Sequence, residues 1–193
     1  MKTRLLLVPA LLLGLTAPAR AAELTLSVSA GVFLPQQPFY RQIYGSSIPL
    51  SFEAGWEFKG GFGLSAGLTA LRDDGRAVAV SGEGEEYPLR FERLTVPLMI
   101  HFSPKVKGFT LRLAAGLAGH FYRERWRTVD LGFEGRTIGP RLGLAVGFPV
   151  LGRLSLFGSL IYEPLSAKSA PPPEEKVELG GVLVLGGVIL RVL

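Results

Sequence analysis

Apolar and polar residues alternate along most of this chain, beginning at Leu24. The segment 89–105, LRFERLTVPLMIHFSPK, shows the alternation most clearly, with apolar residues at Leu94, Val96, Leu98, Ile100 and Phe102. A two-residue period predicts a β-strand with one apolar face. The opposite face has Arg93, Thr95 and His101, so this strand is not buried on both sides. Pro97 also lies on the polar face, although proline cannot donate a ladder hydrogen bond and is uncommon inside sheets.

The same alternation recurs and predicts eight strands. We place them at residues 24–33, 48–59, 62–71, 89–105, 109–121, 137–148, 153–165 and 177–193. The last strand is apolar on both faces, so its pattern does not fix its register. No segment after the N-terminal one has the roughly 18 consecutive apolar residues of a membrane-spanning helix.

Short and long connections alternate between these strands. The short ones are 59–61, 103–108 and 149–152, and the long ones are 34–47, 72–88, 122–136 and 166–176. Strands joined in this way form an up-and-down meander, with tight turns at one end and long loops at the other. That arrangement, with strands of about ten or more residues, is typical of an outer-membrane barrel. We therefore predict an all-β fold, an eight-stranded antiparallel transmembrane β-barrel with short periplasmic turns and longer extracellular loops.

A membrane-spanning sheet explains the alternation, because every backbone group in lipid must be paired within a closed barrel. The apolar face then contacts hydrocarbon, and the polar face lines the lumen. Pro97 is expected to point inward, at a β-bulge or where the ladder is locally hydrated. Aromatic residues near the strand ends fit the interfacial girdles of such barrels. They are Phe33, Phe58, Phe62, Phe102, Phe109, Phe121, Phe148 and Tyr162.

The N-terminal segment has the three parts of a secretory signal peptide. Lys2 and Arg4 form a basic start, residues 5–15 form an apolar stretch, and Ala19-Arg20-Ala21 provides a small-x-small cleavage site. The apolar stretch is too short to span a bilayer. We predict a signal peptide over residues 1–21 and a single outer-membrane barrel domain over residues 22–193.

Composition excludes several other kinds of protein. The chain of 193 residues has no cysteine, so disulfides, zinc–thiolate sites and a cysteine nucleophile are excluded. Its formal charge is +5, but cleavage would remove three basic residues. The mature chain would keep 18 basic and 16 acidic side chains, a net charge of +2. A nearly neutral chain gives no reason to expect nucleic acid binding.

The segment FERLTVPLMIHFSPK followed by GFTLRLAAGLAGHF resembles the paired strands of the small outer-membrane β-barrel domain family. Members often have a strand of the form aliphatic-x-Pro-aliphatic-aliphatic, a short turn, and a strand with an Ala-Gly pair. Val96-Pro97-Leu98 and Ala115-Gly116 match these positions, and strand order and loop lengths extend the resemblance over the whole mature chain. The family includes the transmembrane domain of outer-membrane protein A and adhesion and complement-resistance barrels.

The resemblance implies residence in the outer membrane after export, and insertion by the outer-membrane assembly machinery. One departure concerns that machinery. Family members usually end in an aromatic residue that it reads, whereas this chain ends VILRVL.

Charged residues at inward positions are expected to fill the lumen. They are Glu53, Glu57, Arg112, Arg141 and Glu163. Arg141 and Glu163 are predicted on adjacent strands near the outer end, and Glu57 and Arg112 near the periplasmic end. We predict two ion-pair layers, because buried charges are tolerated when paired and an eight-stranded barrel has just enough interior for its side chains. The lumen is then plugged and is not a diffusion pore; the alternative is a small proton or ion path.

The long loops are the other candidate site. The segment 34–47 is expected to expose Tyr40, and the segment 122–136 contains Arg123, Arg125, Trp126 and Arg127. An arginine–tryptophan cluster above a membrane could bind anionic lipopolysaccharide or a partner protein. The alternative is a solvated loop whose side chains snorkel at the interface. The favoured function is a structural or surface-binding barrel, monomeric, surrounded by outer-membrane lipids.

Two other classes of function stay open. His101 and Ser103 are similar to the His-x-Ser pair of lipid A deacylases, and a Ser-His pair with an acid can transfer acyl groups. The pair adjoins a periplasmic turn, whereas that chemistry acts on outer-leaflet lipid, so we do not predict an enzyme. A soluble lipocalin-type carrier also has eight alternating strands, but its inside is apolar. The sequence has no metal-ligand cluster or phosphate-binding loop, so we expect no metal and no cofactor.

Overall fold

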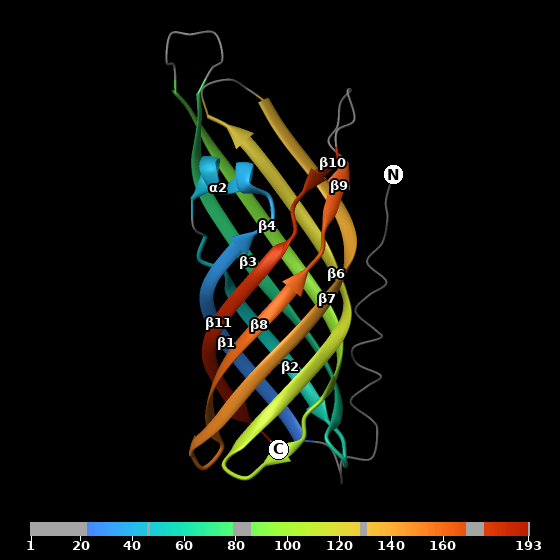
Figure 1. Cartoon of the computed structure of the whole chain (residues 1–193). Coiled ribbons are helices and arrows are strands. Elements are labelled where there is room, and N and C mark those ends of the chain that lie inside the picture. Colours follow the sequence, from blue (N-terminus) through green and yellow to red (C-terminus); the bar gives the residue numbers. More distant parts are fainter. Residues whose placement is uncertain (1–22, 46, 79–85, 128–130, 169–175, 193) are drawn as a thin grey trace.

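A computed structural model describes residues 23–45, 47–78, 86–127, 131–168 and 176–192. Within these residues, eight long antiparallel strands form a closed barrel, which confirms the predicted fold class (Figure 1). They are β1 (Glu23–Pro35), β2 (Leu50–Glu57), β3 (Phe62–Val78), β4 (Glu86–Phe102), β6 (Phe109–Trp126), β7 (Leu131–Leu151), β8 (Leu154–Glu163) and β11 (Gly181–Arg191). Each strand pairs with its neighbours along the chain, and β1 pairs with β11 to close the barrel. The predicted signal peptide lies outside the described residues.

The outer face of the barrel is apolar through its middle. Two exposed rows illustrate this: Leu94, Val96, Leu98, Ile100 and Phe102 on β4, and Leu113, Ala115, Leu117 and Phe121 on β6. Buried interior positions instead include Thr25, Ser29, Ser65, Thr69 and Ser155. An apolar outside distinguishes a transmembrane barrel from a lipocalin, whose outside is polar. The soluble-carrier alternative therefore does not fit this fold.

Pro97 is buried in the barrel interior, as the alternation predicts. The expected bulge is not seen, because β3 and β4 keep the same register on both sides of the proline, with Ala66 opposite Leu98 and Thr69 opposite Thr95. Between these two pairs, Gly67 and Leu68 have no ladder partner on β4. Proline has no N–H to donate. The barrel therefore accommodates Pro97 as a local gap in one ladder.

The three short connections lie together at the lower end of the barrel in Figure 1. One of them contains the two-residue strand β5 (Lys105–Val106), which pairs with the start of β6. Gly60 and Gly61 have φ angles of 100° and 83°, a region that favours glycine. The β2–β3 turn therefore depends on its glycine pair.

Much of two predicted loops is instead an extension of the barrel strands, so the prediction of loops over 72–88 and 122–136 was wrong for residues 72–78, 86–88, 122–126 and 131–136. Residues 79–85 and 128–130 lie outside the described residues. β3 and β4 pair as far as Val78 and Glu86, and β6 and β7 pair as far as Trp126 and Leu131. The physical reason is that the two-residue alternation continues, with charged residues now on the outer face. Cross-strand ion pairs join them, such as Arg90–Asp74 and Arg123–Glu134, each 2.8 Å. The extensions thus stand above the apolar belt.

The other two predicted loops contain short elements. Segment 34–47 includes the helix α2 (Pro38–Tyr44), which begins at a proline, a residue suited to the first helical turn. Segment 166–176 contributes to a hairpin of β9 (Ser166–Lys168) and β10 (Lys176–Glu178). Barrel strand β11 consequently begins at Gly181, later than predicted. No helix among the described residues is long and apolar enough to cross a membrane.

The upper interior holds a hydrophobic core of ten buried residues. They are Phe33, Tyr40, Tyr44, Leu71, Leu89, Phe91, Leu165, Leu179, Leu183 and Leu185. Phe33 was predicted in the outer girdle, but it lies on the inward face of β1 and is buried. Other predicted girdle residues do face outward at the lower end, where the rings of Phe62 and Phe102 have centroids 4.7 Å apart.

Candidate functional site

A buried cluster of charged side chains crosses the middle of the lumen. Glu163, at the end of β8, is 0% exposed and accepts hydrogen bonds from Arg141 on β7 and Arg93 on β4. The Arg93 Nη2–Glu163 Oε2 distance is 3.2 Å, and Arg93 Nη1 also donates to the Leu179 carbonyl at 2.8 Å. The guanidinium of Arg93 lies 4.6 Å from the centroid of the Phe33 ring. The structure thus brings together Arg141 and Glu163, as expected, and adds Arg93.

Arg93 was missed as a lumen residue, although it was identified on the polar face of its strand. Its position two residues before Thr95, on the same inward face, was the sequence signal that could have found it. What the sequence could not show is that Arg93, from a strand not adjacent to β8, reaches the same carboxylate as Arg141. Two cations thus share one buried anion.

Above the charged cluster, α2 closes the mouth of the barrel with aromatic rings. Tyr40 packs edge-to-face against Phe33 and Phe91, at centroid distances of 6.0 and 5.4 Å, and Tyr44 lies 4.7 Å from Tyr40. The Tyr40 hydroxyl donates to Asp73 on β3 at 2.5 Å, and the Tyr44 hydroxyl donates to Glu124 on β6 at 2.7 Å. The helix is therefore fixed to the wall by both packing and hydrogen bonds.

These contacts change the acid–base behaviour of both tyrosines. Burial, helped by the carboxylate of Asp73, raises the pKa of Tyr40 above the ordinary phenol value of 10.0. Burial, helped by the carboxylate of Glu124, raises the pKa of Tyr44 in the same way. Both hydroxyls therefore stay protonated as hydrogen-bond donors well into alkaline solution.

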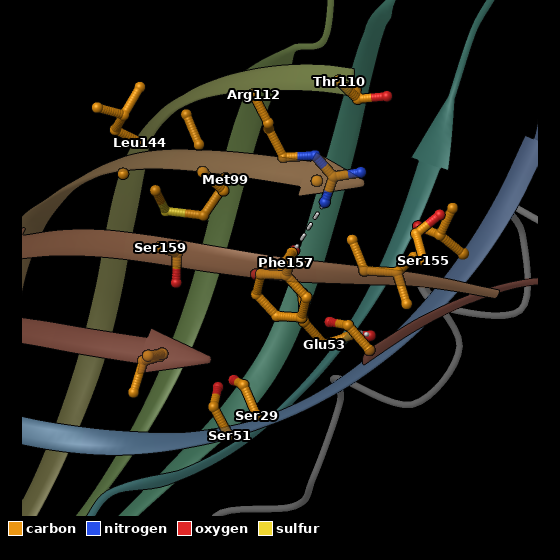
Figure 2. Close-up of a pocket in the computed structure, with 18 of the residues that line it drawn as sticks. Ser29, Ser51, Glu53, Met99, Thr110, Arg112, Leu144, Ser155, Phe157 and Ser159 are labelled. Carbon is orange, nitrogen blue, oxygen red and sulfur yellow. Dashed lines mark hydrogen bonds and ion pairs between the residues drawn. The ribbon is translucent and has the colours of Figure 1, made fainter. Parts of the chain in front are cut away.

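The lower lumen contains a cavity of about 90 Å³ below the charged cluster, lined by charged, hydroxyl and apolar side chains. Figure 2 shows Arg112 reaching across it from β6, with Ser155 and Ser159 from β8 on the same wall. Arg112 Nη1 lies 3.4 Å from Glu53 Oε1, so its ion-pair partner is Glu53 and not Glu57 as expected. Glu57 also lines the cavity. A cavity of this size has room for roughly half a dozen water molecules.

The structure does not assemble a Ser-His catalytic pair. His101 is buried, and neither of its ring nitrogens has a hydrogen-bond partner among the described residues. Ser103 Oγ accepts a 3.3 Å hydrogen bond from Arg112 Nε. His101 and Ser103 therefore share no hydrogen bond, the contact through which a base activates a nucleophile. The described residues also hold no group of three or more metal-binding side chains.

The residues predicted to bind a ligand on the long loops do not all lie free at the surface. Tyr40 is only 7% exposed, so the expectation that segment 34–47 exposes it was wrong. Trp126 is half-buried and donates to Glu124 at 3.0 Å. Arg123 and Arg127 form ion pairs with Glu134 and Asp74, at 2.8 and 2.9 Å. Arg125 is exposed and has no ion-pair partner among the described residues.

Comparisons by sequence identify no relative, since neither a protein-family model nor a curated protein matches the chain. Solved structures match it over most of its length. The outer-membrane protein OprG from Pseudomonas aeruginosa has a TM-score of 0.65 at 11% identity, covering 89% of this chain and 96% of OprG. Neisserial surface protein A has a TM-score of 0.58 at 11% identity, covering 89% of this chain and 97% of its own.

A third match is Ail, the attachment invasion locus protein of Yersinia pestis, solved in complex with the heparin analogue sucrose octasulfate. Its TM-score is 0.56 at 12% identity, and the match covers 89% of this chain and 97% of Ail. At such low identities, the three likenesses establish a shared fold. That fold is the eight-stranded barrel of small outer-membrane proteins.

Proposed function

We propose that this protein is an outer-membrane barrel with a structural or surface-binding role, and that its lumen is not a diffusion pore. The observation that carries the proposal is a double obstruction. The Arg93–Glu163–Arg141 cluster fills the middle of the lumen, and the rings of Tyr40 and Tyr44 fill its mouth. Opening a path would require separating buried opposite charges, which is strongly unfavourable.

Single-channel recording tests the closed lumen. The refolded full chain is inserted into a planar bilayer in concentrated KCl, with a sixteen-stranded porin as the positive control for insertion and detection. We expect no stepwise conductance from this barrel at bilayer voltages at which the porin conducts. Stable, reproducible conductance steps from the wild-type chain would contradict the closed lumen and favour the ion-path alternative.

A surface-binding role is supported by the strand extensions above the belt. They present Arg123, Arg125 and Arg127, and Arg125 has no ion-pair partner within the part of the chain that the structure describes. Guanidinium groups suit sulfate and phosphate groups because their donors match such oxygens in pairs. Ail was solved with a sulfated heparin analogue. A polyanion, lipopolysaccharide included, is the ligand class that this surface would bind.

Titration of sucrose octasulfate onto the barrel in lipid nanodiscs tests this role. We expect Arg125→Gln to weaken the apparent affinity severalfold, since it removes the unpaired cation. The matched control is Arg41→Gln, an exposed arginine on α2. Equal affinities for the wild type and both variants would argue against a polyanion site on the extensions.

Catalysis is not part of the proposal, because His101 and Ser103 share no hydrogen bond and lie at the periplasmic end. If the hydrolase alternative were correct, lipid A from cells making the wild type would be deacylated, and His101→Ala would abolish the change. We expect lipid A of unaltered mass in both cases. Insertion by the outer-membrane assembly machinery and a monomeric state remain part of the proposal.

A further inference from the structure

The outer face of the barrel has a groove of about 800 Å³ at the extracellular end of the apolar belt. It runs across β2, β3, β4, β6 and β7, and two cross-strand rows line it. The lower row, in register, is Leu50, Ala70, Leu94, Phe121 and Arg136. The upper row is Arg72, Glu92, Arg123 and Glu134. The groove thus follows the line where hydrocarbon contact gives way to charge.

The upper row largely neutralises itself. Arg123 donates to Glu134 through both Nε and Nη2, at 3.2 and 2.8 Å. Arg72 and Glu92 form a looser pair, with a 4.0 Å separation between Nε and Oε1. These exposed pairs contribute little to stability. Their main effect here is that each positive charge is balanced by a negative one. Neither pair therefore gives the groove a net preference for anionic or cationic ligands.

Arg136 differs from every other residue of the lower row. It takes the place of an apolar residue beside Phe121, it is exposed, and it has no ion-pair or hydrogen-bond partner among the described residues. With Arg136, the exposed side chains of the groove include three arginines and two glutamates. A charged side chain at the edge of hydrocarbon is stabilised by reaching a polar or charged group near the headgroups. None of the described residues forms such a contact with Arg136.

We propose that this groove binds the anionic headgroup of an outer-leaflet lipid, with Arg136 as the principal cation and Arg123 as its partner. Arg123 and Arg136 are diagonal neighbours on adjacent strands, because Phe121 pairs with Arg136 and Arg123 pairs with Glu134. Such diagonal positions are roughly 7–8 Å apart, within reach of two long side chains that converge on one phosphate. Guanidinium groups donate in pairs to phosphate oxygens.

The apolar half of the groove indicates a lipid and not a free anion. Beside Arg136 in the lower row, Phe121, Leu94 and Leu50 belong to one apolar strip, and they are 49%, 42% and 61% exposed. An acyl chain attached to the bound headgroup would extend along this strip. A soluble phosphate would use the arginines alone and gain nothing from these contacts.

Native mass spectrometry of the detergent-solubilised barrel tests the proposal with defined lipids. The probes are phosphatidylglycerol, which is anionic, and phosphatidylcholine with the same acyl chains, with glycerol phosphate as a soluble competitor. Arg136→Gln is the test variant, and Arg41→Gln is the matched control. Arg41 is also exposed and its side chain has no ion-pair or hydrogen-bond partner among the described residues, but it does not line the groove. A gel shift between unboiled and boiled samples establishes that each variant is folded.

We expect the wild type and Arg41→Gln to retain phosphatidylglycerol at least fivefold more strongly than phosphatidylcholine. Arg136→Gln should lose most of this preference, and glycerol phosphate should not displace the lipid. Equal retention by Arg136→Gln and the wild type would overturn the site, as would an equal loss in both variants. Full displacement by glycerol phosphate would overturn the choice of a lipid. None of these outcomes depends on whether the lumen conducts, so this test and the bilayer test fail independently.

Discussion

Glu163 is the residue on which the interior depends most. It is the shared acceptor for Arg93 and Arg141, and all three side chains are at most 3% exposed. Removing one member of a buried ion pair leaves an uncompensated charge out of water, which costs far more than the pair contributes when intact. Here the loss of one carboxylate would leave two such charges.

We therefore expect Glu163→Ala to lower the free energy of unfolding by about 3–5 kcal/mol. Urea titration of the barrel refolded in liposomes, read by the gel shift between folded and unfolded forms, measures the change. Glu86→Ala is the control, because it removes an exposed partner of Arg76 and should change stability by less than about 1 kcal/mol. Similar losses in the two variants would show that the central cluster is not the main electrostatic support of the lumen.

The two buried phenols predict sensitivity to alkali. Their pKa values are raised in the folded protein, so their stabilising effect is complete below the unfolded value of about 10 and is lost as the pH rises above it. Between pH 9 and 11 each phenol should lower the free energy of unfolding by up to about 1.4 kcal/mol. Urea titrations at both pH values should show a smaller loss in the double variant Tyr40→Phe, Tyr44→Phe. Tyr162→Phe, on the outer face, should behave as the wild type does.

Within a single strand, the faces could be predicted from the sequence. Alternation along β4 and β6 correctly assigned lipid-facing and lumen-facing residues, Pro97 included, because a closed barrel in lipid enforces that separation everywhere. The extents of the strands could not be predicted. Residues such as Arg72 and Asp74 continue the alternation outside the membrane, but the polarity of the two faces is reversed there. The outer face is charged, and the inner face carries buried apolar residues such as Leu89 and Phe91.

The same limit applies to the burial of α2 and to the ion-pair partner of Arg112. Nothing local marks the segment containing Tyr40 and Tyr44 as buried, because its burial depends on contacts with Phe33 on β1 and Phe91 on β4. Likewise, the choice of Glu53 over Glu57 as the partner of Arg112 depends on side-chain reach across the barrel. Such long-range contacts leave no periodic trace in a sequence.

One face of β6 is assigned to lipid contact. The loss of stability caused by a charged substitution on that face should therefore depend strongly on its depth in the membrane. Leu117 is 59% exposed and lies midway along the apolar row of the strand, whereas Phe121 lies at its extracellular edge. We expect Leu117→Arg to destabilise the barrel in liposomes by about 2–4 kcal/mol, and Phe121→Arg by no more than about 1 kcal/mol from the charge itself. Urea titration of both variants provides the measurement. Equal effects would contradict the position of the belt.

At the scale of the whole molecule, the barrel presents different ends to the two sides of its membrane. Short turns with positive-φ glycines form one end, and the charged strand extensions form the other. Because the chain has no cysteine, single introduced cysteines report on each end without background. Arg125→Cys should react with a membrane-impermeant maleimide on intact cells, and Lys107→Cys only after the envelope is disrupted. The reverse labelling pattern would show that the barrel has the opposite orientation in the membrane.

The pairing of β1 with β11 has a consequence for how the protein reaches this state. Thr25 lies opposite Arg191, so the last ladder to form joins residues from nearly opposite ends of the chain. Contacts so distant in sequence are entropically costly and slow to form. Until they form, β1 and β11 are both open edges that can pair with any other strand nearby. Closure is therefore the step at which folding and aggregation compete, and a chaperone that shields these two edges would have its largest effect there.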